Sequence, residues 1–188
     1  GEVRGYTANP SVRLPPNDRG KLDVARAVGE GFVAVVRNNP VWKQPYRGIT
    51  SIVSGEIAED VAHYLTDSEQ TPSALGAGVL VNPETDEVLA AGGWLVQMLP
   101  GATEESIAAV ERNIADLGKS PTELIRCGET ALGICRRLSR GLRDQELVPP
   151  YVSKPRFNCH CSIEKVYRTV ALMPRQEMEE EIEKQGSL

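Results

Sequence analysis

Two cysteines one residue apart, Cys159 and Cys161, are the side chains of this sequence best suited to chemistry. Thiols at this spacing can supply two corners of a tetrahedral zinc site, or they can be joined as a disulfide. A structural zinc site normally takes four protein ligands, so this pair is half of one. The chain continues for 27 residues after Cys161, so either the other ligands come from elsewhere or the sequence is cut short.

The residues around the pair favour ionised thiols. Arg156 precedes the cysteines, and a helix expected to begin at Ser162 would place its positive N-terminal end beside them. Because a thiolate is the form that binds metal and reacts with oxidants, the pattern predicts a metal-binding or redox role. His160 is expected not to bind the same ion, since the backbone rarely lets three consecutive residues do so. The alternative is that His160 is a third zinc ligand.

The other cysteines and the histidines give little sign of catalysis. Cys127 and Cys135 lie in an apolar helical stretch and are expected to be buried structural thiols. A cysteine nucleophile needs a base, and the sequence has two histidines, His63 and His160. It lacks Gly-x-Ser-x-Gly, His-Glu-x-x-His and phosphate-binding loops of the usual spacing. We therefore expect a protein that is not an enzyme.

The composition is that of an ordinary globular protein. With 188 residues, 40% of them hydrophobic, the chain can form one domain or one domain with a small appendage. Its 21 basic and 26 acidic residues leave a formal charge of −5, which argues against dedicated nucleic-acid binding. No apolar run approaches the roughly 20 residues that a membrane span needs. Four cysteines without a disulfide-rich pattern favour a reducing compartment.

The first hundred residues carry mostly strand patterns. Phe32–Val36 is a β-branched run, and Ile49–Val53 is a weaker strand candidate. Apolar residues at helical spacing predict a helix over Gly55–Leu65. A β-hairpin is expected around a turn at residues 82–86. After it, Gly92-Gly93 is expected to open a further strand, with a bulge or a close backbone approach.

From Thr103 onward the patterns are helical. Ser120-Pro121-Thr122-Glu123 is a capping box with proline at the first helical position, which is a strong helix start. The helix is expected to continue to Leu138 with interruptions at Gly128 and Gly133, each of which costs about 1 kcal/mol relative to alanine. This region should therefore be helical but only marginally stable. Two shorter helices are expected after the cysteine pair.

Three ordered stretches of the sequence resemble the heat shock protein 33 family of redox-regulated molecular chaperones. The first comprises Tyr46–Gly48, Ser54–Tyr64 and Ser68–Ser73, the second is Ala91–Ala102, and the third is Cys159–Ser162. The similarity extends over nearly the whole chain. Three motifs in order at compatible spacing are far more specific than any one of them.

The resemblance implies an α+β fold in three parts. Residues 1–102 would be a β-rich core domain packed with helices, residues 103–150 a metastable helical linker, and residues 151–188 the start of a small zinc-binding redox-switch domain. Two departures imply a fragment. The family's core begins before the segment at Gly1, and its second half-site, a Cys-x-x-Cys, would fall just beyond Leu188. We therefore expect weak or no zinc binding by this chain alone.

The resemblance also implies a function. Members of the family are ATP-independent holdases in which four reduced cysteines bind zinc; on oxidation they form disulfides, zinc leaves, and the linker unfolds to expose apolar surface. Cys159 and Cys161 would be zinc ligands and would form one redox disulfide. The expected partners are unfolded or oxidatively damaged proteins and, on activation, a second copy; neither nucleic acid nor a membrane is expected. The expected location is the cytoplasm, or an organelle stroma in a eukaryote.

Two other functions stay open at this point. The first is a zinc-dependent structural or interaction module without redox chaperone activity, its remaining ligands supplied by a partner chain. The second, a thiol oxidoreductase, is disfavoured because a Cys-x-Cys disulfide closes a strained ring and no thioredoxin-like βαβ pattern surrounds it. Peroxide treatment distinguishes the interaction module from a redox-regulated chaperone. A redox switch should form a disulfide, lose zinc and lose helicity, whereas a plain structural site should resist oxidation.

Overall fold

The structure, a computed structural model, describes residues 1–18, 20–142 and 151–185. The chain divides into two compact units. The central unit is Ser11–Pro149, and the terminal unit combines Gly1–Pro10 with Pro150–Leu188. Helices and strands occur together, so the expected α+β class is confirmed. Among the described residues, no helix is long and apolar enough to cross a membrane.

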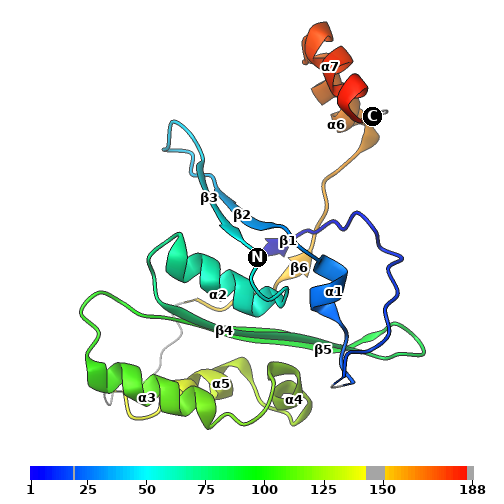
Figure 1. Ribbon diagram of the computed structural model, residues 1–188. Helices are drawn as coiled ribbons and strands as arrows, with labels where there is room; N and C mark the ends of the chain where they lie inside the picture. Colours follow the sequence, from blue (N-terminus) through cyan, green and yellow to red (C-terminus); the bar gives the residue numbers. More distant parts are fainter. Residues whose placement is uncertain (19, 143–150, 186–188) are drawn as a thin grey trace. The chain divides into compact units, whose positions relative to one another are not determined.

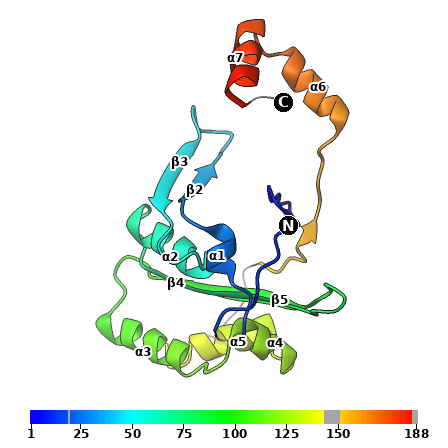
Figure 2. The same cartoon turned by 45° about the vertical axis from the view of Figure 1, so that its right-hand side comes forward.

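The central unit is built around a long antiparallel hairpin. β4 (Ser73–Val81) pairs with β5 (Val88–Gln97), which confirms the hairpin expected around residues 82–86. α2 (Ile57–Asp67) lies against one face of this hairpin, and α4 (Pro121–Arg126) lies against the other (Figure 1). The same three layers are visible from a second direction in Figure 2.

The glycine pair lies in the middle of β5 and does not open a new strand. A Cβ atom added to Gly92 would be 2.6 Å from Ile125 Cδ1, and one added to Gly93 would be 2.5 Å from the carbonyl oxygen of Gly76. The expected separate strand is therefore wrong, whereas the expected close backbone approach is confirmed. The irregularity in the hairpin register falls instead between Leu80 and Val81.

A second, two-stranded sheet joins β2 (Phe32–Arg37) antiparallel to β3 (Tyr46–Ser51). Both expected strands are present, although the second begins and ends earlier than its pattern indicated. Gly48 is buried in β3, where an added Cβ atom would be 2.5 Å from Tyr64 Oη. Glycine at this position thus lets the α2 tyrosine ring lie directly on the sheet.

Two carboxylates fix the connections of this unit. Asp23 caps the short helix α1 (Val24–Val28) by accepting a hydrogen bond from the Arg26 N–H at 3.2 Å. Asp60, which is buried on α2, accepts hydrogen bonds from the N–H groups of Val53 and Ser54 at 2.9 and 3.0 Å. The segment between β3 and α2 is therefore tied to the helix that follows it.

Three short helices cover the second face of the long hairpin. α3 (Glu104–Ala115) starts at the Thr103 cap, α4 starts at the Ser120 capping box, and α5 (Ala131–Leu138) starts at the Thr130 cap. The buried apolar cluster of the unit comprises Leu124 of α4, Ile134 and Leu138 of α5, and Leu117, which follows α3. Trp94, Val96 and Ile114 pack against it.

The long interrupted helix expected up to Leu138 is in fact two helices. α4 ends before Gly128, whose φ of +84° suits glycine and turns the chain. Gly133 does not interrupt α5, because it lies in the first turn and its N–H donates to Thr130 Oγ1 at 3.0 Å. Cap chemistry at Thr130, rather than the glycine count, decides where the second helix begins.

The terminal unit joins segments from far apart in the sequence. β1 (Glu2–Val3) runs parallel to β6 (Arg156–Phe157), and an extended segment leads from β6 to α6 (Ile163–Ala171) and then α7 (Arg175–Gln185) (Figure 1). Both C-terminal helices were expected. The two-residue strands were not, because a pair so short carries no periodic pattern of its own.

Candidate metal and redox site

Cys159 and Cys161 lie on the segment between β6 and α6. Its first part is held by β1, because the Arg156 N–H donates to the Gly1 carbonyl at 3.0 Å and the Asn158 N–H donates to the Val3 carbonyl at 2.9 Å. Both thiols are free and exposed. The pairing thus presents two reduced sulfurs at the surface of the terminal unit.

The carboxylate of Glu2 gathers three side chains from the cysteine segment. Arg156 Nη2 donates to Glu2 Oε1 at 2.7 Å, and His160 Nε2 lies 3.5 Å from Glu2 Oε2. Asn158 Nδ2 is 3.0 Å from the same histidine nitrogen. The pKa of Glu2 is held below its ordinary value by hydrogen bonds, of which the one from Arg156 has the largest effect, followed by those from Asn158 and His160.

The two thiols have pKa values shifted in opposite directions. The Cys161 backbone N–H is the main group that lowers the pKa of Cys159, followed by the Cys161 side chain. The hydrogen bond and the negative charge of Cys159 in turn raise the pKa of Cys161, while Arg4 and Lys165 favour the thiolate of both. Cys159 is therefore the first of the pair to ionise.

The start of α6 fixes the far end of the cysteine segment. Ser162 caps the helix, its Oγ accepting from the Lys165 N–H at 3.3 Å. The ammonium of Lys165 donates to the His160 carbonyl at 2.7 Å. The segment between residues 158 and 162 is thus anchored at both ends within the terminal unit.

The donor set suits zinc but supplies half of a structural shell. Soft thiolates are preferred zinc ligands, and two neighbouring ones can occupy two corners of a tetrahedron. In the part of the chain that the structure describes, no group of three or more His, Cys, Asp and Glu side chains is placed to hold a metal ion. The ring nitrogen Nε2 of His160 faces Glu2 and Asn158. Its exclusion from the ligand set stays a prediction.

The expectation that Cys127 and Cys135 are buried is wrong, since both are exposed. Cys127 comes directly after α4, where Lys119 Nζ lies 3.3 Å from its sulfur. Cys135 follows Ile134, which faces the core together with Leu138, so the cysteine is turned off the buried face. The four-residue spacing of Ile134 and Leu138 is a signal in the sequence that could have identified this face.

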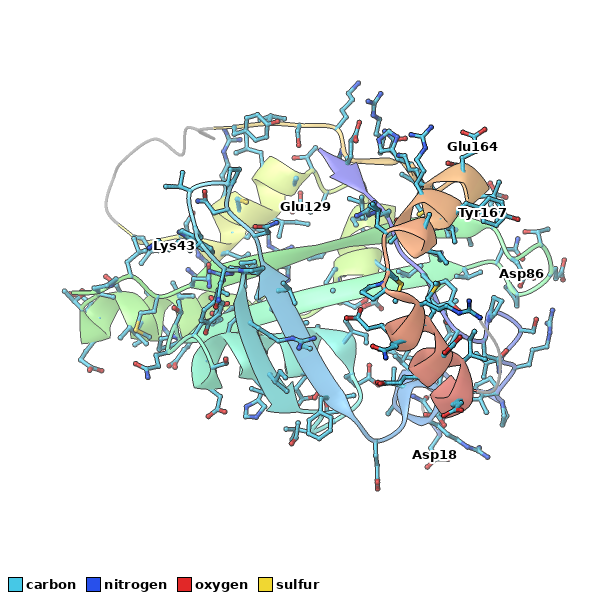
Figure 3. All side chains as sticks on the ribbon, turned by 90° about the horizontal axis from the view of Figure 1, so that it is seen from above. Asp18, Lys43, Asp86, Glu129, Glu164 and Tyr167 are labelled. Atoms are coloured by element: carbon cyan, nitrogen blue, oxygen red, sulfur yellow. The ribbon has the colours of Figure 1, made fainter. Side chains whose placement is uncertain are left out.

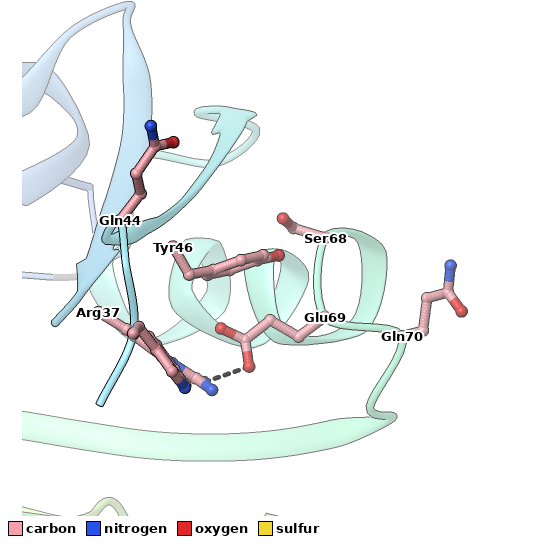
Figure 4. A pocket seen from close by; sticks show the side chains of 7 residues that line it. Arg37, Gln44, Tyr46, Ser68, Glu69 and Gln70 are labelled. Atoms are coloured by element: carbon pink, nitrogen blue, oxygen red, sulfur yellow. Dashed lines mark hydrogen bonds and ion pairs between the residues drawn. The ribbon is translucent and has the colours of Figure 1, made fainter. Parts of the chain in front are cut away.

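Sequence reasoning missed a hollow of about 540 Å³ beside the β2–β3 hairpin. There Arg37 pairs with Glu69, whose other oxygen accepts from Tyr64 Oη at 2.9 Å. Figure 4 shows Arg37 directed toward Glu69, with the Tyr46 ring alongside. The Arg37–Glu69 ion pair stabilises the junction between β2 and the end of α2. Because these two charges neutralise each other, neither is free to bind a charged ligand.

A smaller hollow of about 220 Å³ lies between β5 and the helices that cover it. Its walls are mostly apolar, and they include Trp94, Val96, Val110, Ile134, Leu138 and Leu142. Most of these side chains belong to or border the buried cluster. This surface would become accessible if α5 left the hairpin.

Comparisons with known proteins agree with one another. A family model described as Hsp33 protein matches residues 1–188. The 33 kDa chaperonin of Brevibacillus brevis is 44% identical over 99% of this chain, and that of Gloeobacter violaceus is 45% identical over 99%. The crystal structure of the 33 kDa chaperonin (heat shock protein 33 homolog) from Thermotoga maritima is similar with a TM-score of 0.78 and 36% identity, over 95% of this chain.

The match covers part of each relative. This chain spans 62% of the Brevibacillus protein, 60% of the Gloeobacter protein and 59% of the Thermotoga chain. The relatives are therefore longer than the sequence described above.

Proposed function

We propose, because the chain belongs to the Hsp33 family, that it forms part of a redox-regulated, ATP-independent holdase chaperone. Its clients are unfolding and oxidatively damaged proteins, which it binds once its cysteines are oxidised. The active form is a homodimer, and the protein works in the cytoplasm. Several bacterial relatives carry the name 33 kDa chaperonin, which supports the chaperone role.

The observation that carries the redox part is the hydrogen-bonded pair of exposed thiols with unequal acidity. The Cys159 thiolate attacks a peroxide oxygen and releases hydroxide, which leaves a sulfenic acid. The Cys161 sulfur then displaces the sulfenic hydroxyl as water, and the S–S bond forms. Two electrons pass from the two sulfurs to the peroxide, so atoms and charges balance.

The reduced pair would hold zinc as two of its four ligands, the others coming from outside residues 1–188. Bound zinc would neutralise the thiolates and stabilise the small unit around them. What this chain contributes is the Cys159 thiolate, its hydrogen bond from the Cys161 N–H and the ordered segment between Asn158 and Ser162.

The arrangement of α3, α4 and α5 supports the client-binding part of the proposal. α4 and α5 carry Leu124, Ile134 and Leu138 of the buried cluster, and Leu117 follows α3. Trp94 and Val96 of the long hairpin pack against this cluster. Release of the helices would expose apolar side chains on both surfaces at once. Contiguous apolar surface is what a holdase needs in order to capture an unfolding chain.

The proposal is tested with the complete polypeptide under peroxide. We expect a Cys159–Cys161 disulfide in peptide maps, release of zinc, loss of helical circular dichroism and protection of a heat-unfolded client without ATP. A Cys159→Ser/Cys161→Ser variant should lose this response, while a Cys127→Ser/Cys135→Ser variant should keep it. Oxidant-triggered protection that survives in the Cys159→Ser/Cys161→Ser variant would overturn the proposal. Resistance of the wild type to peroxide would favour a plain zinc-dependent interaction module.

A further inference from the structure

We propose that Glu2, on the strand β1, is a positioning residue that holds the Cys159–Cys161 segment in shape for the two thiols to act together. The inference rests on the proposed function and adds a regulatory element to it: a strand about 150 residues earlier in the sequence controls the geometry of the thiol pair. Backbone pairing, one shared carboxylate and the alternation of side chains along the segment carry it.

The backbone pairing is the first observation. β1 pairs in parallel with β6, Glu2 opposite Arg156 and Val3 opposite Phe157. The ladder extends one step beyond β6, because the Asn158 N–H donates to the Val3 carbonyl at 2.9 Å. The pairing therefore ends one residue before Cys159.

The side chains of alternate residues then converge on one group. Arg156 Nη2 is 2.7 Å from Glu2 Oε1, and His160 Nε2 is 3.5 Å from Glu2 Oε2. Asn158, which lies between them in the sequence, contacts both the carboxylate and the histidine ring. One carboxylate thus binds three residues spaced two apart, which is the spacing of one face of an extended chain.

The cysteines occupy the intervening positions. Along an extended segment, side chains at odd and even positions point to opposite faces. Because Arg156, Asn158 and His160 turn to Glu2, the intervening Cys159 and Cys161, both free and exposed, occupy the alternate positions of the segment. A glutamate on β1 therefore sets both the backbone course and the common orientation of the sulfurs.

The far anchor at α6 makes this control effective. Lys165 donates to the His160 carbonyl at 2.7 Å, and Ser162 caps the helix. With both ends fixed, the segment loses little further freedom when the thiols bind an ion, and such preorganisation raises affinity. Without Glu2, one of the two anchors is weakened.

The test compares Glu2→Ala and Glu2→Gln in the complete polypeptide, with Glu164→Gln as the matched control. Glu164 is an exposed acid of the same unit whose side chain projects from α6 (Figure 3). The measurements are amide hydrogen exchange at Asn158, zinc affinity by chelator competition, and the thiolate-to-metal charge-transfer band of the cobalt(II)-loaded protein.

We expect Glu2→Ala to speed exchange at Asn158 and weaken zinc binding, each by roughly threefold or more, as the loss of a partly exposed ion pair and its neighbours allows. The cobalt band should change in intensity. Glu2→Gln, which keeps an acceptor oxygen for Arg156, should lie between Glu2→Ala and the wild type, and Glu164→Gln should match the wild type.

Wild-type values for exchange, affinity and the cobalt band in Glu2→Ala would overturn the inference and leave the proposed function intact. Should the wild type itself neither hold zinc nor form the disulfide, the proposed function fails and the role of Glu2 in thiol geometry fails with it. Faster Asn158 exchange in Glu2→Ala with unchanged zinc affinity and cobalt band would show an ordinary structural ion pair, which also contradicts a positioning role.

Discussion

Cys159 and Cys161 show how a backbone hydrogen bond can separate two chemically identical groups. The Cys161 N–H stabilises the Cys159 thiolate, and this thiolate makes ionisation of Cys161 harder. In the proposed oxidation, Cys159 would therefore be the nucleophile and Cys161 the thiol that closes the disulfide. This difference depends on local geometry and is invisible in the spacing alone.

The difference can be measured by alkylation of the zinc-free protein with iodoacetamide as a function of pH. In the wild type, Cys159 should react with a lower pH midpoint than Cys161. In Cys161→Ser, Cys159 keeps the backbone N–H and its low midpoint, whereas in Cys159→Ser the midpoint of Cys161 should fall, because its negative neighbour is gone. Equal midpoints for the two thiols in the wild type would contradict this division.

Asp60 makes the stability of the central unit depend on pH. The N–H of Ser54 is the main group that lowers its pKa, with further hydrogen bonds from Val53 and Gly55. A carboxyl whose pKa is depressed by folding stabilises the folded state above its unfolded pKa of about 4, and that stability is lost as the pH falls through the folded pKa.

Asp60→Asn should therefore lower the urea midpoint of unfolding at pH 7, and the gap to the wild type should narrow on acidification toward pH 3. The neighbouring exposed acid Glu59 provides the control, since Glu59→Gln should leave the midpoint near that of the wild type. A gap between Asp60→Asn and the wild type that stays constant with pH would show that the aspartate acts by packing rather than charge.

At the scale of single elements, local signals predicted most of what the structure shows. The Ser120 capping box, the β-branched run of β2 and the helical spacing in α2 each specify their element within a few residues. β1 and β6 could not be predicted in this way, because each has two residues and its partner lies about 150 positions away. The anchoring of the cysteine segment by Glu2 was hidden for the same reason.

The glycines of the long hairpin are a second feature that pattern alone could not resolve. A Cβ atom on Gly76 would be 2.6 Å from Trp94 Cε2, so the indole lies directly on the opposite strand. The sequence indicated a close approach at the glycine pair of β5, but not which side chain fills the space across from it.

Gly76→Ala should consequently destabilise the central unit by roughly 1–3 kcal/mol, because the indole must move out of a packed position. Gly31→Ala is the matched control, since its added Cβ atom would lie at an ordinary 3.6 Å from Ile52 Cδ1. Denaturant unfolding followed by Trp fluorescence measures both. Similar unfolding midpoints for the two variants would refute the claim that Trp94 packs on Gly76.

At the scale of the whole molecule, the helices assigned to the linker pack against the strands assigned to the core. α3, α4 and α5 belong to the central unit and contribute most of its buried cluster. The boundaries 1–102, 103–150 and 151–188 stay predictions, and residues 143–150 lie outside the described residues. Resemblance indicated the family and the thiol pair, whereas the packing of the helices required the structure.

If release of these helices is what activates client binding, a charge in their core should bypass oxidation. Ile134→Asp places an unpaired carboxylate at a buried site, which is strongly unfavourable. The reduced complete protein should then bind an apolar dye and protect a client without peroxide, while hydrogen exchange in β4 and β5 stays slow. Arg136→Asp, at an exposed position of α5, is the control and should stay inactive until oxidised.

If reduced Ile134→Asp does not protect a client while β4 and β5 stay folded, release of the helices does not cause client binding. Loss of protection from exchange throughout the central unit would instead show that the helices and the hairpin fold as one cooperative body. The milder change Ile134→Ala, expected to cost about 2–5 kcal/mol, then distinguishes weakening from collapse.

The parallel pairing of Glu2 with Arg156 also constrains the order in which the parts of the chain can fold during synthesis. Synthesis runs from the N-terminus, so Ser11–Pro149 leaves the exit tunnel before β6, the partner of the strand at residues 2–3, has been made. In a single copy, the thiols cannot be held in their final arrangement until the central unit has emerged. A nascent chain therefore acquires the paired arrangement of β1 with the cysteine segment only after Ser11–Pro149 has been made.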